Sequence, residues 1–402
     1  MRQHSFIPSG CQLWVHQILA AGPSHLAYIS SLAVHSYCSS TFRPVSLLVC
    51  QDRRPTAVAM SPSRTGLLAF SLAGKSTIKV YDVDSESEVC TSDAPARGEV
   101  SHIAWDLTDE SSLIVSVGTS LLRWRYVTDK WELLRDFTQR NLVYLFRQSP
   151  AKPTLVAVAL PEGRVLVLEI PPGSCSSGSP SSSSAAALAS PSSTTSAVDG
   201  RGLGGLGLGS GLSGLFLGGL LSSSASGSIV REWILNDEGV ECTGGTGVIG
   251  DSGREGERDG AKGHPNQRQP SQQQPFLQHQ QERGSNPKFT SSGSNGGLGD
   301  ASDLAWDPAH PAGYLLVACA RGGMVLLDVE AGEVVAGFAK QPAGSRFVTF
   351  VPRQPGNFLV ASTRSATLQM WNVSKSDRPI QNFRAGGKST LFGVMVLPSC
   401  SG

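Results

Sequence analysis

The chain has 402 residues with a formal net charge of +1, and only 16% of its residues are charged. This balance gives no sign of a nucleic-acid or anionic-membrane partner. The eight cysteines include no Cys-x-x-Cys pair and no zinc-finger spacing to a histidine, so neither a disulfide framework nor a metal site is expected. No secretory signal follows the first methionine, and we expect a cytoplasmic protein.

Residues 11–50 are expected to form a first, weakly marked unit of four short strands. Segments 13–15, 26–29, 32–35 and 45–49 would supply these strands in turn. Each segment is too short for a core helix and rich in strand-forming residues. The third strand should end near Cys38.

The same plan recurs in residues 55–96, 98–140 and 141–170. In each unit the first apolar strand ends in a turn, and the third strand ends in an aromatic or apolar residue followed by a polar one. From Asp82 to Arg125 is 43 positions, and from Arg125 to Glu169 is 44. These endings are the candidate structural sites, and two later units share them: Tyr81 and Asp82, Trp124 and Arg125, Leu168 and Glu169, Leu327 and Asp328, Trp371 and Asn372.

The repeat stops at residue 171 and resumes at 302. Blocks rich in serine, glycine and leucine, or glutamine fill residues 171–301, and we expect a disordered insertion because such segments cannot offset the entropy of ordering. The uncharged tract 203–221 is rich in glycine and is expected to be a linker rather than a membrane span. Residues 228–235 are apolar enough for a strand, either the missing outer strand of the 141–170 unit or a linear motif anchored by Trp233.

Residues 302–398 should hold two further units and a final strand. The first has apolar runs ending at Trp306, Ala318 and Val329, and the second spans 345–384. Segment 391–397 and the proline after it repeat the first-strand pattern. Either this strand closes a ring, or the chain is a shortened form of a longer protein.

A four-stranded unit of about 44 residues that ends in a Trp-Asp-like dipeptide is typical of a WD40 propeller blade. We therefore predict an all-β, WD40-type β-propeller of six to seven blades. Its first part would occupy residues 11–170 with about four blades, and its second part residues 302–398. The low-complexity insertion at 171–301 would interrupt it.

Few residues suggest chemistry. The segment 74–76 resembles the end of a phosphate-binding loop but lacks the earlier glycine and leads into a strand, so a hairpin turn is expected. The inner strands are mostly apolar, with His102 and Asp303 as the few polar candidates for a catalytic centre in the channel. Trp105 and Trp306 are expected in the blade core rather than in a ligand cage. We predict no catalytic, cofactor-binding or metal-binding residues.

Several segments resemble the WD repeat-containing protein 17 family: 10–14, 27–28, 305–308, 314–317 and 370–374. The resemblance covers about 11–170 and 300–398, the N-terminal propeller of that family, and implies an interaction scaffold. Arg125, Glu169 and Asn372 replace the usual aspartate of the dipeptide. The buried hydrogen-bond network of such blades is therefore expected to be incomplete, with stability depending more on apolar packing.

The predicted function is a non-enzymatic scaffold that mediates protein–protein interactions through the rigid disc of a propeller. Its partners would be other proteins, without nucleic acid, cofactor or membrane insertion. The alternative is a subunit of a membrane-coat or ciliary-transport assembly, truncated from a longer propeller–solenoid protein.

Overall fold

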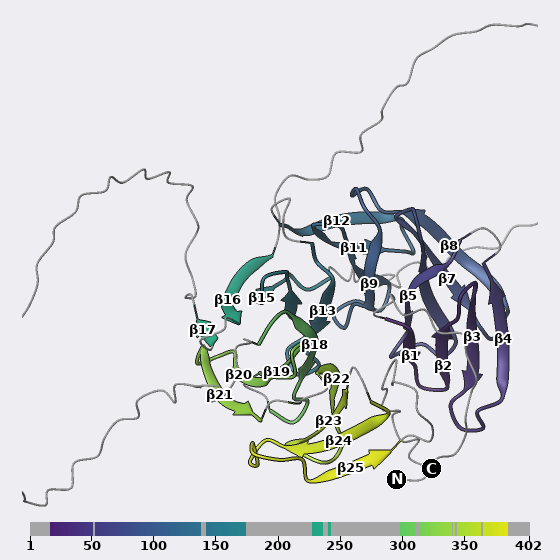
Figure 1. Ribbon diagram of the computed structural model, residues 1–402. Coiled ribbons are helices and arrows are strands. Elements are labelled where there is room, and N and C mark those ends of the chain that lie inside the picture. Colours follow the sequence, from purple (N-terminus) through teal and green to yellow (C-terminus); the bar gives the residue numbers. More distant parts are fainter. Residues whose placement is uncertain are drawn as a thin grey trace, which may run out of the picture.

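The computed structural model describes residues 17–50, 53–137, 142–173, 227–235, 240–242, 298–310, 313–339, 341, 344–362 and 365–384. Within these ranges the chain forms 25 strands and no helix, hence no helix that could cross a membrane. Six antiparallel sheets stand around a common centre as the blades of a propeller (Figure 1). The predicted all-β propeller is confirmed, with six blades in the described residues.

Each sheet is built from consecutive strands that pair in chain order, the innermost first. The first sheet contains β1 (Leu19–Ala21), β2 (His25–Ile29), β3 (Ala33–Cys38) and β4 (Pro44–Val49). The second contains β5 (Pro55–Met60), β6 (Leu67–Leu72), β7 (Thr77–Asp82) and β8 (Ser87–Asp93). The third contains β9 (Val100–Trp105), β10 (Ser112–Val117), β11 (Ser120–Arg125) and β12 (Lys130–Asp136).

The remaining three sheets follow the same order. The fourth contains β13 (Leu145–Gln148), β14 (Leu155–Ala159), β15 (Arg164–Glu169), β16 (Ser228–Leu235) and β17 (Val240–Cys242). The fifth contains β18 (Ala301–Trp306), β19 (Tyr314–Cys319), β20 (Met324–Asp328) and β21 (Glu333–Phe338). The sixth contains β22 (Ser345–Phe350), β23 (Asn357–Ser362), β24 (Thr367–Asn372) and β25 (Gln381–Arg384).

The inner strand of the first sheet differs from the prediction. Residues 13–15, and likewise the final segment 391–398, lie outside the described residues, and β1 occupies the inner position instead. The turn after β1 contains Gly22 and Pro23, which match Ser61 and Pro62 after β5. The prediction of 13–15 was wrong because it overlooked this turn signal, which places the inner strand a few residues later.

The fourth sheet takes its outer strand from within the predicted insertion. Strand β16 pairs antiparallel with β15, with Val165 opposite Trp233. The Trp233 side chain is fully buried among residues of the fourth and fifth sheets. The alternative of a linear motif anchored by Trp233 is therefore wrong. Strand β17, which pairs with β16, was not predicted, and residues 174–226 and 243–297 lie outside the described residues.

Neighbouring sheets pack their apolar faces against each other, and five such cores join the six sheets in sequence. Trp124 lies between the second and third sheets, and Trp371 between the fifth and sixth, both fully buried. Trp105 and Trp306 also lie in these cores, as predicted. Their indole N–H groups donate to carbonyl oxygens of the preceding sheet, Ala59 at 3.2 Å and Arg147 at 2.9 Å respectively.

A polar link is repeated near the centre of the ring. A hydroxyl next to, or at the second residue of, an inner strand donates to a backbone carbonyl at the corresponding start of the next inner strand. The four links are Thr56 to Val100 (3.3 Å), Ser101 to Val143 (2.6 Å), Tyr144 to Ala301 (2.8 Å) and Ser302 to Ser345 (2.7 Å). These bonds fix the spacing of successive sheets where side chains are too short to do so by packing.

Gln17 joins the first sheet to its neighbours in a related way. Its backbone forms a parallel bridge with Ala57 of β5. Its side-chain amide donates to the carbonyl of Ile103 at 2.6 Å and accepts from the N–H of Ile103 at 2.8 Å. One residue thus connects the first three sheets at the centre of the ring.

We expect Tyr144→Phe to lower the free energy of unfolding by about 1 kcal/mol, because it leaves the buried carbonyl of Ala301 without its donor. Chemical denaturation followed by tryptophan fluorescence would measure this. Tyr37→Phe, at a half-buried ring of the first sheet, serves as the control. Equal stability of the Tyr144→Phe and native proteins would contradict a structural role for the link.

Candidate functional site

The predicted dipeptides all lie at the ends of third strands. β7, β11, β15, β20 and β24 end at Asp82, Arg125, Glu169, Asp328 and Asn372 respectively. The residue before each is directed toward a core: Trp124, Leu168, Leu327 and Trp371 are buried, and Tyr81 is half-buried against the core of the first two sheets.

The polar members of the dipeptides mostly cap the hairpin that follows. The Asp82 carboxylate accepts from the N–H of Asp84 at 2.9 Å, and Asp328 accepts from Ala331 at 2.9 Å. The Asn372 side chain accepts from the N–H of Ser374 at 2.9 Å. These bonds hold the turn from the third to the fourth strand, so the side chains serve the blade and are not directed at a ligand.

Arg125 instead joins a polar network in the third sheet. Its guanidinium lies 3.1 Å from the carboxylate of Asp109, which also accepts from the hydroxyls of Ser111 and Ser112 at 2.6 and 2.7 Å. Burial acts to raise the pKa of Asp109, but the bonds from Ser111 and Ser112 and the charge of Arg125 outweigh it and lower the pKa to about 2.

A second ion pair of the same sheet is almost fully buried. Arg123 donates through Nε to Asp106 at 2.7 Å, through Nη1 to Glu132 at 3.0 Å and through Nη2 to the carbonyl of Pro171 at 2.6 Å. Pro171 is where the repeat pattern stops, so this arginine fixes the chain as it leaves the fourth sheet. The expected network of the dipeptides is replaced here by a different one, built on Asp106 and Arg123.

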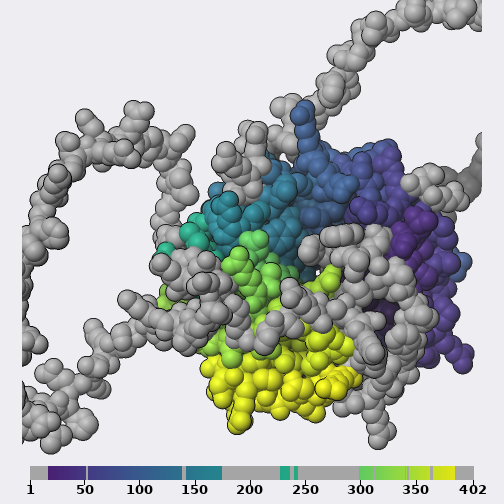
Figure 2. Space-filling view, viewed as in Figure 1, coloured from purple at the N-terminus to yellow at the C-terminus, as the bar shows by residue number. Residues whose placement is uncertain are grey.

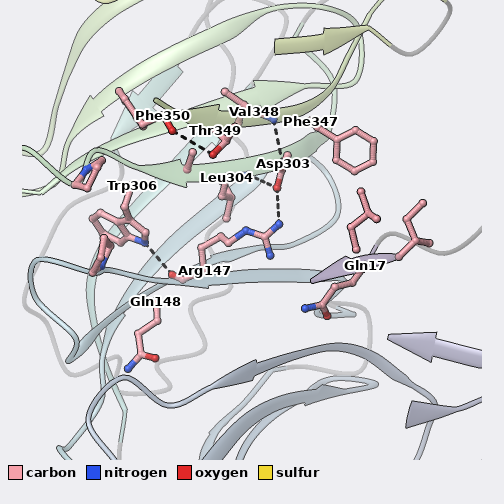
Figure 3. Close-up of a pocket in the computed structure, with 15 residues that line it drawn as sticks. Gln17, Arg147, Gln148, Asp303, Leu304, Trp306, Phe347, Val348, Thr349 and Phe350 are labelled. Atoms are coloured by element: carbon pink, nitrogen blue, oxygen red, sulfur yellow. Dashed lines mark hydrogen bonds and ion pairs between the residues drawn. The ribbon is translucent and has the colours of Figure 1, made fainter. Parts of the chain in front are cut away.

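The centre of the ring holds a charged cluster drawn from three sheets. Arg147 of β13 contacts the imidazole of His102 on β9 and donates through Nη2 to Asp303 of β18 at 3.0 Å. The other oxygen of Asp303 accepts from the N–H of Val348 on β22 at 3.1 Å (Figure 3). His102 and Asp303, the two predicted polar candidates of the inner strands, are thus brought to one place by Arg147.

The cluster borders a central pocket of about 320 Å³. β13, β18, β22 and residues 17–19 line it, with Gln17, Arg147, Trp306, Phe347 and Thr349 around the cavity in Figure 3. Among the described residues, no three His, Cys, Asp or Glu side chains are grouped to hold a metal ion. The pocket therefore combines one arginine with mainly apolar and amide side chains.

Asp303 is engaged on both of its oxygens, since Oδ1 also accepts from the N–H of Leu304 at 2.9 Å. Burial raises its pKa, and Arg147 and the two backbone N–H groups oppose this effect. A carboxylate saturated by protein donors is poorly placed as a general base. Its position ties the fourth, fifth and sixth sheets together, which is a structural role.

Sequence reasoning missed Arg147, Arg123 and Asp106. Arg147 had a visible signal, because a charged residue interrupts an otherwise apolar inner strand. It also expected Asp303 to cap a turn, as Asp307 does by accepting from the N–H of Ala309 at 2.9 Å. The segment 74–76 forms the hairpin between β6 and β7, as predicted, and Gly74 has a positive φ of 74°.

Comparison with models of known protein families and with curated proteins finds no match to this chain.

Arg147→Met should lower the free energy of unfolding by about 2 kcal/mol at neutral pH, because it leaves the Asp303 carboxylate buried without its partner. Arg147 is partly exposed, so the loss falls short of that for a fully buried pair. The deficit should shrink as the pH falls, since protonation of Asp303 removes the unpaired charge. Urea denaturation at several pH values measures it, and a deficit that the added Asp303→Asn change does not reduce would contradict this assignment.

Asp109→Asn should cost about 2 kcal/mol at pH 7, because a pKa lowered from 3.8 to about 2 stabilises the folded state whenever the group is ionised. This contribution is complete above the unfolded pKa near 4 and disappears as the pH falls through about 2. Denaturation at pH 7 and near pH 2 would show the difference closing. Asp377→Asn, at an exposed carboxylate, is the matched control.

Proposed function

We propose that this protein is a non-enzymatic scaffold that binds other proteins, a WD40-type propeller like that of the WD repeat-containing protein 17 family. Residues 11–170 and 302–398 would form the two parts of the propeller, with 171–301 as a low-complexity insertion that contributes an outer strand. The cytoplasm is the proposed location, with no nucleic-acid partner.

The observation that carries this proposal is the use made of the central polar groups. A six-bladed propeller is typical of protein-interaction scaffolds, although fold alone does not decide function. In this ring Arg147, Asp303 and Gln17 spend their hydrogen bonds on neighbouring sheets. A catalytic centre needs polar groups that are held near a substrate but remain available to it. The rim and the loops are the surfaces left for partners.

Affinity capture with the full chain, followed by quantitative mass spectrometry, tests the proposal. Trp124→Asp, which places a charge in a fully buried position, provides a control that loses the folded ring, as circular dichroism would verify. We expect defined proteins to be enriched on the native chain relative to this control. Identical protein sets on the folded and unfolded chains would contradict the scaffold function.

A further inference from the structure

Strand β4 lies at the outer rim of the first sheet, at the right of Figure 1 and in the purple part of the rim in Figure 2. It pairs with β3 on one side, and its other edge has no partner strand among the described residues. An edge strand presents backbone N–H and C=O groups that can pair with a further strand.

The side chains of β4 are unusually apolar for such a position. Leu47 and Val49 are two residues apart and therefore share one face, and they are 57% and 61% exposed. Val45, at the bulge in the pairing with β3, is 36% exposed. Leu32 is 55% exposed and extends this surface, because its carbonyl accepts from the N–H of Cys50 at the end of β4. We call Leu32, Val45, Leu47 and Val49 the β4 surface.

The other sheets protect their outermost strands with charge, and the first sheet does not. Each of the other five outermost strands contains at least one charged residue, and β4 contains none: Glu88 in β8, Glu132 in β12, Glu241 in β17, Glu333 in β21 and Arg384 in β25. Charged side chains on an edge strand oppose pairing with another chain. The absence of charge in β4 removes that protection at one blade only.

The surroundings of β4 favour an acidic partner. Residues 17–81 contain one acidic residue, Asp52, against six basic ones: Arg43, Arg53, Arg54, Arg64, Lys75 and Lys79. Arg43, immediately before β4, and Arg54, five residues after its end, are both exposed. Positive charge at both ends of an apolar edge attracts a segment that is apolar in its centre and acidic at its ends.

We propose that the free edge of β4 binds an extended acidic segment of a partner protein as an added strand. Alternate apolar side chains of that segment would cover the β4 surface, and its acidic ends would lie near Arg43 and Arg54. Main-chain hydrogen bonds supply affinity in this mode of recognition, and the side chains supply selectivity. The inference rests on the scaffold function and specifies its binding surface and the chemistry of the partner.

Fluorescence anisotropy with the full chain tests the proposal. The probe is a labelled synthetic peptide in which valine and threonine alternate between paired glutamates. We expect Leu47→Lys to weaken binding at least tenfold, since it places a charge on the edge, and added salt to weaken binding to the native chain. Thr91→Lys is the matched control, because Thr91 occupies in β8 the place of Leu47 in β4, each opposite the third residue of its neighbouring strand, and it should bind normally.

Three outcomes would overturn the proposal: no binding of the glutamate peptide, equal binding of a peptide with lysines in place of the glutamates, or equal binding by the Leu47→Lys chain. Self-association in sedimentation that Leu47→Lys abolishes would also overturn it, because the occupant would then be a second copy. Affinity capture separates the two proposals. Partners retained by the Leu47→Lys chain would reject the β4 edge and leave the scaffold function standing.

Discussion

Every blade of this protein is a sheet with two apolar faces, and only a neighbouring sheet can cover each of them. In the third sheet Leu113 and Trp124 face the second sheet, while Ile114 and Leu121 face the fourth, and all four side chains are fully buried. Burial of such side chains contributes about 1.5–3 kcal/mol each. Because no blade can satisfy this demand alone, the sheets assemble side by side, and the side chains left for binding lie on the rim, the loops and the channel.

The ends of the third strands could be predicted because local turn chemistry marks them at a regular spacing. β7 and β11 end at Asp82 and Arg125, where the sequence indicates a hairpin. The start of the ring could not be predicted in the same way, since two apolar segments precede β2. The choice between them depends on the contacts of Gln17 with the second and third sheets, which are distant in sequence. The role of Asp303 likewise depends on Arg147, 156 residues away.

Strand β16 illustrates how far a blade can extend in sequence. It begins more than 50 residues after β15 ends, yet it pairs in register along the strand. The entropy of closing a loop grows only with the logarithm of its length, so an insertion of this size adds little cost. The full burial of Trp233 offsets that cost. An apolar segment inside a polar tract is thus a usable sequence signal for β16, whereas the three residues of β17 are too few to give one.

The net charge of +1 conceals a separation of charge around the ring. Residues 341–384 contain six basic residues and one acidic residue, Asp377, and residues 17–81 have the same imbalance. Residues 82–169 are acidic on balance, but Asp106 and Asp109 there are neutralised by buried ion pairs. Exposed charges act over about one Debye length, roughly 8 Å in physiological salt. A partner at the first sheet therefore senses Arg43 and its neighbours rather than the whole molecule, so a near-neutral composition leaves room for a local preference for acidic segments.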